Sequence, residues 1–406
     1  MSDTATLRSA IPSIDTNRPE LFRDDVWQPL FAKLRAEDPV HYCAESRHGP
    51  YWSITRHADV FAVDNDPQTF SSSYLLGGVQ IADDDRPNVI TMDAPEHTAR
   101  RKALTPVVSP KNLVRFEGLI RERARTVLDG LPRGVEFDWV QNVSVELTSM
   151  MLATLFGHPV EDRQRLIHWS DVTTADINDP DSPISTEEQR MGVLGEFHVF
   201  MNELVERRRN EPLGSDVISL LAHNEDFIKA SPEEKTATFA ILLVAGNDTT
   251  RNSMSGGLWG ISQNPGQMEL LKSRPNLITN AIAEMIRFQT PVLLLRRTAT
   301  RDVEMHGRQI LKGEKVVMWY ISANRDETVF DDADHVRVDR ENARQHLAFG
   351  MGPHRCLGSR LAELQLRILW EEILARDLYI EVLGPPTYAY SAMVRTVQSL
   401  PVKIKP

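Results

Sequence analysis

One long helical segment near the middle of the chain constrains the fold more than any other feature. Ser231 is a natural N-cap, Pro232 suits the first helical position, and Glu234 completes an S-x-x-E capping box. Apolar residues then recur at helical spacing until Asn264 and Pro265 end the pattern. The segment covers about 33 residues, or about 50 Å at roughly 1.5 Å per residue. Because a helix of this length crosses a whole globular domain, we expect it to lie at the centre of the fold.

Helical periodicity also dominates the chain between about residue 94 and about residue 375. Apolar side chains at spacings of three and four predict helices over residues 113–128, 143–156, 189–209 and 363–374. Shorter β-favouring runs predict strands over residues 50–54, 308–311 and 315–321. The expected fold is therefore mainly α with small β-sheets.

The composition favours one globular unit over a modular or membrane protein. Of the 406 residues, 41% are hydrophobic and 25% are charged, and the 21 Gly and 24 Pro are spread along the chain without a linker-like tract. No apolar run approaches the roughly 18 residues that a membrane span requires. The N-terminal residues show no signal-peptide pattern. We expect a single domain over residues 1–406, a monomer, and a cytoplasmic location.

Charge and cysteine content narrow the possible functions. The chain has 46 Lys and Arg against 57 Asp and Glu, a formal net charge of −11, which argues against a nucleic-acid partner because phosphate backbones carry the same sign. The two cysteines, Cys43 and Cys356, are expected to be separate thiols in a reducing compartment. Free cysteines are among the most buried residues, so inert packing is the default interpretation for each, and Cys43 keeps it.

Cys356 stands in a loop with three glycines that leads into a predicted helix. At such a junction unpaired N–H groups and the helix dipole lower the pKa of a thiol. A cysteine nucleophile would need an oriented histidine, yet His354 is two positions away with nothing to orient it. Zinc would need further ligands, and the chain has no C-x-x-C or H-x-x-x-H motif. A haem iron can be held by one axial thiolate, and the loop's glycines would let the backbone lie against a planar ring.

The pattern Phe349-x-x-Gly352-x-x-x-Cys356-x-Gly358 resembles the cysteine-ligand loop of cytochrome P450. The resemblance implies that Cys356 is the axial ligand of haem b and that Phe349 and Gly350 lie against the cofactor. It implies the cytochrome P450 fold, in which an α-rich lobe and a smaller β-containing lobe enclose the haem. Since a thiolate ligand favours O–O cleavage, the implied activity is monooxygenation, the insertion of one oxygen atom from O₂ into a C–H bond.

The middle of the long helix reads Ala-Gly-Asn-Asp-Thr-Thr over residues 245–250. Gly and Thr are unfavourable inside a helix, and Thr can bond back to the preceding turn, so we expect a local distortion there. Taken alone, the sequence could be an ordinary polar patch. It resembles the acid–alcohol pair of the same family, which implies that Asp248 delivers protons and that Thr249 holds dioxygen. Ala245 would lie beside the cofactor.

Haem propionates require cations and hydrogen-bond donors. His97 and Arg101 are four residues apart, on one face of a helix predicted to start after Pro95, and they resemble the propionate clamp of the family. Arg297 and His354 resemble the remaining propionate contacts. Each of these residues taken alone could be surface charge.

Glu284 and Arg287 are three residues apart on a predicted helix, so their side chains share a face. A solvated ion pair is the ordinary interpretation of such spacing. The resemblance implies instead a buried Glu-x-x-Arg pair behind the haem, with Arg340 as its third member. The expected role is in folding and haem assembly.

The resemblance also assigns substrate-pocket residues, for which plain core packing is the alternative. These are Leu75, Leu76, Val79, Val89, Leu242, Val292, Leu293, Leu294, Met393 and Val394. Residues 246–254, 316–320 and 360–370 are similar to the bacterial terminal alkane and fatty-acid hydroxylases. The expected reaction is terminal hydroxylation of a medium-chain alkane or fatty acid. The alternatives are a bulkier terpenoid or steroid substrate, a peroxide-driven hydroxylase, and a non-catalytic haem-thiolate sensor.

Electrons must come from other proteins, because the chain has no Gly-rich flavin or nicotinamide motif. By resemblance, the expected partners are a ferredoxin and an NAD(P)H-dependent ferredoxin reductase, and the other reactants are O₂ and a small apolar substrate. Four basic residues are candidates for the ferredoxin surface: Arg100, Lys102, Arg115 and Arg355.

Overall fold

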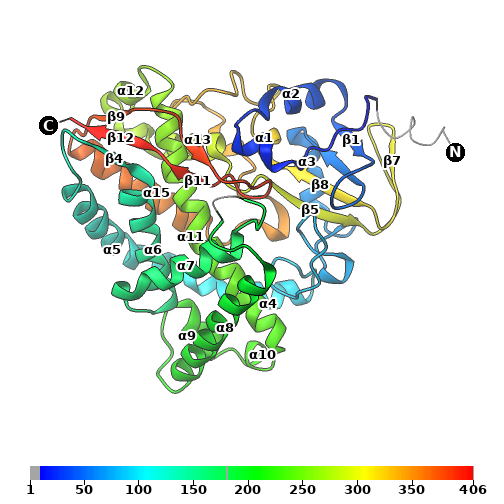
Figure 1. Cartoon of the computed structure of the whole chain (residues 1–406), viewed down its shortest axis with the longest axis horizontal. Coiled ribbons are helices and arrows are strands. Elements are labelled where there is room, and N and C mark those ends of the chain that lie inside the picture. Colours follow the sequence, from blue (N-terminus) through cyan, green and yellow to red (C-terminus); the bar gives the residue numbers. More distant parts are fainter. Residues whose placement is uncertain (1–9, 180–181, 406) are drawn as a thin grey trace.

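Helices make up most of the chain, as the apolar spacing predicts (Figure 1). The computed structural model describes residues 10–179 and 182–405. Within these ranges the α-helices are α1 (Pro19–Arg23), α2 (Gln28–Glu37), α3 (His57–Asn65), α4 (Glu96–Leu104), α5 (Pro110–Asp129), α6 (Glu146–Phe156), α7 (Arg163–Thr174), α8 (Glu187–Arg209), α9 (Val217–Ala222), α10 (Glu225–Ile228), α11 (Pro232–Ser262), α12 (Gln267–Ser273), α13 (Ile278–Gln289), α14 (Tyr320–Ala323) and α15 (Ser359–Ala375). Shorter helical turns are η1 (Tyr74–Leu76), η2 (Thr105–Val108), η3 (Val140–Val145), η4 (Val160–Asp162), η5 (Pro275–Leu277), η6 (Ala343–Gln345) and η7 (Gly352–His354).

The strands are few and short. They are β1 (Val40–Cys43), β2 (Tyr51–Ile54), β3 (Phe70–Ser71), β4 (Glu136–Asp138), β5 (Leu294–Ala299), β6 (Val303–Met305), β7 (Arg308–Ile310), β8 (Lys315–Trp319), β9 (Ile380–Val382), β10 (Thr387–Tyr388), β11 (Val397–Ser399) and β12 (Pro401–Ile404). The largest sheet in the described ranges has the order β1-β2-β8-β5-β3, with β2 and β8 parallel and the other neighbours antiparallel. The smaller sheets are β4-β12-β9, β10-β11 and β6-β7. The predicted class, mainly α with small sheets, is confirmed.

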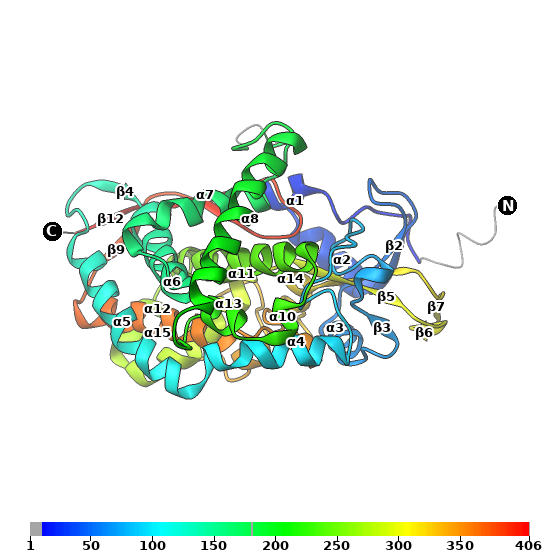
Figure 2. The same ribbon diagram turned by 90° about the horizontal axis from the view of Figure 1, so that it is seen from below.

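Helix α11 runs through the middle of the molecule, with α7 and α8 on one side and α4 and α15 on the other (Figure 2). Its N-terminus is capped as predicted, because the Ser231 hydroxyl accepts a hydrogen bond from the Glu234 backbone N–H at 3.2 Å. The second half of the predicted capping box, a bond from the Ser231 backbone N–H to the Glu234 carboxylate, is wrong. The Glu234 carboxylate instead accepts a bond from Arg100 Nε at 2.5 Å, since an arginine on a neighbouring helix offers a charged donor.

Two predicted elements change their type within the predicted range. The strand predicted over residues 315–321 ends at Trp319, and Tyr320 begins the short helix α14. Periodicity cannot separate the two forms in so short an apolar run. The helix predicted from residue 143 begins as the π-helical turn η3, and the α-helix proper starts at Glu146.

Buried apolar side chains form a large cluster around α11 and two smaller ones on the faces of the main sheet. Alternate residues of β8 separate these smaller clusters: Val317 and Trp319 pack with Phe31, whereas Val316 and Met318 face the other side. The sheet and the helical part thus each have their own core. None of the helices in the described ranges combines the length and the apolar character that spanning a bilayer requires.

Candidate active site

The loop that carries Cys356, here called the cysteine loop, lies between β8 and α15 and is held by hydrogen bonds within its own backbone. The Cys356 N–H donates to the Phe349 carbonyl at 2.8 Å, and the Gly350 N–H donates to the Leu347 carbonyl at 2.9 Å. Gly350 and Gly352 have φ values of +64° and +63°, a conformation that favours glycine. A Cβ on Gly352 would overlap the carbonyl oxygen of Asp64 on α3. These two glycines therefore allow the loop to pack closely against helix α3.

The Cys356 thiol has accessible surface although protein surrounds it. The predicted stabilising groups are present. The pKa of the thiol is lowered by the backbone N–H groups of Gly358 and Ser359 and by the Arg101 guanidinium. Burial outweighs them and raises this pKa above its usual value. The expected low pKa of the free thiol is therefore wrong.

His97 on α4 packs against His354 of the cysteine loop, with ring centroids 4.1 Å apart. Burial, together with the nearby charge of Arg297, lowers the pKa of His354 to about 2. Burial also lowers the pKa of His97. Arg101 donates to the Arg355 carbonyl at 2.6 Å and lies close enough to lower both histidine pKa values. Two neutral imidazoles and two guanidinium groups thus gather beside the cysteine loop.

One polar atom of this group is buried and unpaired. His97 is 3% exposed, and its Nε2 has no hydrogen-bond partner in residues 10–179 and 182–405. A buried imidazole nitrogen without a partner is costly, so it indicates a place where a bound group completes the bond. The cationic surroundings favour an anionic group there.

Arg297 on β5 belongs to the same group but is already paired. Its Nη2 donates to Asp64 Oδ1 at 2.7 Å, and its Nη1 donates to the Arg296 carbonyl at 2.9 Å. Nothing in the sequence around Asp64 marks it as part of the site, since its partners are far away along the chain.

Helix α11 continues without a break through residues 245–250, which corrects the expected distortion. The Thr249 hydroxyl does bond back to the Ala245 carbonyl, at 3.4 Å, as its residue type allows. This single long bond is compatible with an intact helix. Ala245 is exposed even though it lies halfway along the central helix, so this turn of α11 borders an accessible space.

Asp248 is fully buried and held by one of its two oxygens. Its Oδ1 accepts bonds from Asn247 Nδ2 at 3.0 Å and Ser170 Oγ at 3.3 Å, and Arg251 Nη2 lies 3.0 Å away. Its Oδ2 has no partner within the described residues. Burial raises the pKa of Asp248, and the charge of Arg251 offsets part of the effect. A buried carboxyl with a raised pKa is suited to hold and release a proton.

Glu284, Arg287 and Arg340 form one buried ion cluster. Glu284 and Arg287 are 0% exposed, and the carboxylate accepts bonds from Arg287 Nε at 2.7 Å and Nη2 at 2.8 Å and from Arg340 Nε at 2.9 Å. Arg287 also donates to the carbonyls of Asn324 and Ala333, each at 2.7 Å. Burial alone would raise the pKa of Glu284, yet the hydrogen bond and charge of Arg287 bring it below its usual value. The solvated ion pair, the ordinary interpretation, is wrong here.

The residues assigned to a substrate pocket divide into three sets. For Leu293, Leu294 and Val79 the structure favours the core-packing alternative, because each is at most 1% exposed and the two leucines pack against the cluster around Trp319. Val394 is 9% exposed and pairs with Val292 in an isolated β-bridge. The remaining assigned residues keep accessible surface and stay candidates: Leu75, Leu76, Val89, Leu242, Val292 and Met393.

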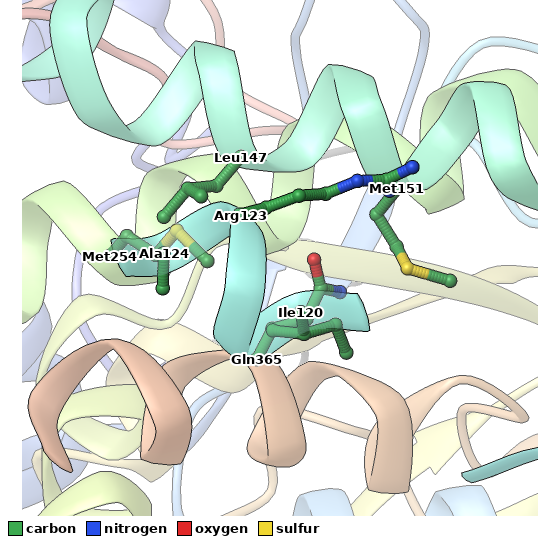
Figure 3. Close-up of a pocket in the computed structure, with 7 residues that line it drawn as sticks. All are labelled: Ile120, Arg123, Ala124, Leu147, Met151, Met254 and Gln365. Carbon is green, nitrogen blue, oxygen red and sulfur yellow. The ribbon is translucent and has the colours of Figure 1, made fainter. Parts of the chain in front are cut away.

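A small cavity lies elsewhere, among helices α5, α6, α11 and α15 (Figure 3). The side chains around it are Ile120, Arg123, Ala124, Leu147, Met151, Met254 and Gln365. None of the residues assigned to the site lines this cavity, so it belongs to the packing of the helical part.

The chain is similar to one family of enzymes along its whole length. The sequence profile described as cytochrome P450 matches residues 267–376. Linalool 8-monooxygenase from Pseudomonas putida is 38% identical over 407 residues, which cover 97% of this chain and 99% of that protein.

Two solved structures are also similar over almost the whole chain. Cytochrome P450-153 from Novosphingobium aromaticivorans has a TM-score of 0.89 at 42% sequence identity and covers 96% of this chain and 99% of that one. For CYP153D17 from Sphingomonas sp. PAMC 26605 the TM-score is 0.90 at 41% identity, with coverage of 97% and 99%. Identity at this level over nearly complete chains shows that this protein belongs to the cytochrome P450 family.

Proposed function

We propose that this cytochrome P450 monooxygenase hydroxylates the terminal carbon of medium-chain alkanes or fatty acids. The observation that supports the proposal most is the resemblance of the stretches 246–254, 316–320 and 360–370 to terminal alkane and fatty-acid hydroxylases. The 42% identity to cytochrome P450-153 over 96% of the chain supports the monooxygenase chemistry that the proposal requires.

The family's cofactor is a haem with a cysteine ligand, and the residues present suit it. Cys356 would bind the iron, and a coordinated thiol is deprotonated by the metal, so the raised pKa of the free thiol does not oppose binding. His97 Nε2, buried without a partner, is free to bond to a propionate. We assign Arg101, Arg297 and His354 to the same carboxylates. When bound, the haem supplies oxygen activation, which the axial thiolate favours.

The acid–alcohol pair would control protons in this reaction. Because burial raises its pKa, Asp248 can carry a proton, and its unpaired Oδ2 is the atom free to pass it on. Asn247 and Arg251 hold the other oxygen and so fix the orientation of the carboxyl group. The Thr249 hydroxyl is bound only weakly to its own helix, which leaves it available to donate toward dioxygen.

An apolar chain would bind through burial of its methylene groups. Each buried CH₂ contributes about 0.8 kcal/mol, so a chain of roughly eight to twelve carbons would gain about 6 to 10 kcal/mol before the costs of binding. Leu242, Val89 and Met393 offer accessible apolar surface for it. Affinity should therefore rise with chain length until the pocket is full.

A terpenoid substrate is the second candidate. The observation in its favour is the 38% identity to an enzyme named linalool 8-monooxygenase. A branched terpenoid would fill a wider and shorter pocket than an unbranched chain of equal carbon number.

A separate ferredoxin would supply electrons, and the net charge of −11 makes a local basic patch necessary for an acidic partner. Lys102, Arg115 and Arg355 are exposed and remain candidates for this patch. Arg100 is a weaker one than the sequence suggests, because its side chain is 24% exposed and paired with Glu234 at 2.5 Å.

The test is a ferric spin-state titration with alkanes, fatty acids, linalool and steroids, followed by product analysis with ferredoxin, reductase and NADH. Tight binding of C8 to C12 chains and terminal alcohols as the main products would support the proposal. Dominant in-chain hydroxylation, or a spin shift with linalool or steroids only, would refute it. Turnover with peroxide but not with NADH would indicate a peroxide-driven enzyme, and the absence of product under both conditions would indicate a sensor.

A further inference from the structure

The carboxylate of Asp64 on α3 contacts both Arg297 and the cysteine loop, and the proposed mechanism does not use it. Asp64 is 4% exposed and joins three separate parts of the chain. Its Oδ1 accepts a bond from Arg297 Nη2 of β5 at 2.7 Å. Its Oδ2 accepts bonds from the hydroxyl of Tyr320, the first residue of α14, at 3.0 Å, and from the Met351 N–H of the cysteine loop, at 2.7 Å.

All three partners are donors, which matches an ionised carboxylate. Tyr320 is fully enclosed, and burial together with the charge of Asp64 raises the pKa of its hydroxyl well above the usual value. The tyrosine therefore stays protonated and donates. Since Arg297 is itself only 2% exposed, the two opposite charges lie together in a region of low dielectric constant.

Two glycines allow the cysteine loop to approach Asp64 closely. Gly350 and Gly352 flank Met351, and a side chain on Gly352 would overlap the Asp64 carbonyl oxygen, while one on Gly350 would crowd Asp64 Oδ2. Helix α3 thus touches both the loop that carries Cys356 and Arg297, which we assign to a haem propionate. A shift of Asp64 would move both.

We propose that Asp64 is a positioning residue of the haem site: it fixes Arg297 and the cysteine loop relative to each other, and its negative charge lowers the reduction potential of the bound haem. A negative charge near the iron favours the ferric over the ferrous state, and here it also offsets the opposite effect of Arg297. This inference rests on the haem cofactor of the family and is independent of the substrate proposal.

The test is the reduction potential of the purified, substrate-free holoprotein, measured by spectroelectrochemical titration. Asp64→Asn keeps the size of the side chain but removes its charge. It should raise the ferrous-to-ferric ratio at a fixed potential by roughly three- to tenfold, where tenfold corresponds to about 59 mV for one electron. Asp64→Glu keeps the charge and should restore a potential near that of the wild type.

Asp59→Asn is the matched control. It removes a carboxylate from the same helix. Asp59 Oδ1 lies 2.9 Å from His306 Nε2, and neither residue is assigned to the haem site, so the reduction potential should not change. Tyr320→Phe removes one hydrogen bond without changing charge and should shift the potential less than Asp64→Asn does.

Retention of haem by Asp64→Glu together with its loss from Asp64→Asn would also support the proposal, because the two variants differ in charge. Equal loss of haem from both, equal shifts in both, or an Asp64→Asn potential matching that of Asp59→Asn would overturn it. No alkane or fatty acid enters these measurements, so an incorrect substrate class would leave the result unchanged.

Discussion

Substitution of Glu284 by glutamine gives the sharpest prediction about what holds the haem site together. The change leaves the size of the side chain nearly the same but removes the charge that pairs with Arg287 and Arg340. Both guanidinium groups are at most 3% exposed and would remain buried with less compensation. Removing one member of a buried ion pair costs about 3 to 5 kcal/mol. A folded protein is stable by only about 5 to 15 kcal/mol.

Urea unfolding of the holoprotein, followed by tryptophan fluorescence and by Soret absorbance, measures this cost. The midpoint for Glu284→Gln should fall by about 1 to 2 M, and much of the protein should be isolated without haem. The matched control is Asp331→Asn, which breaks the surface pair of Asp331 and Arg337, whose side chains are 93% and 42% exposed. It should cost less than about 1 kcal/mol. Equal midpoints for the two variants would refute the assignment of stability to the buried cluster.

Three further predictions concern protons, electrons and acid stability. Thr249→Ala should leave haem binding intact but divert NADH equivalents to hydrogen peroxide, and unchanged coupling to product would remove Thr249 from the mechanism. Arg115→Glu should weaken ferredoxin-supported turnover, more so at low salt, whereas indifference to charge and salt would place the docking surface elsewhere. Although burial raises it, the pKa of Glu372 lies at about 2 because bonds from Arg125 and Arg376 outweigh that effect. Its stabilising contribution is therefore complete above about pH 4.5 and is lost as the pH falls toward 2, so Glu372→Gln should flatten acid unfolding curves in that range.

The sequence predicts best those elements that depend on residues close together in the chain. The cap at Ser231 and the apolar spacing after it predict α11 almost to the residue. The predicted bond between the Glu234 carboxylate and the Ser231 N–H is wrong, because Arg100, more than a hundred residues away, binds this carboxylate instead. Similarly, the type and spacing of Glu284 and Arg287 favour a surface pair, and only the resemblance to a family indicates burial.

Long-range contacts explain what the sequence could not reveal about the site. Asp64 looks like any acidic residue of a short helix, since its partners Arg297, Tyr320 and Met351 come from positions more than two hundred residues away. The resemblance assigns Leu293 and Leu294 to the substrate pocket, but an apolar side chain suits a pocket wall and a sheet core equally well. Only packing distinguishes the two, and here it places both leucines in the core.

The most direct test of the account is the absorption spectrum of the reduced protein under carbon monoxide. The wild type and Cys43→Ser, whose buried thiol lies on β1, should both show the Soret band of thiolate-ligated haem. Cys356→Ser should lose that band, because Cys356 is the residue assigned to bind the iron. A Cys356→Ser variant that keeps the thiolate spectrum, or a wild-type protein that never shows it, would contradict the assignment.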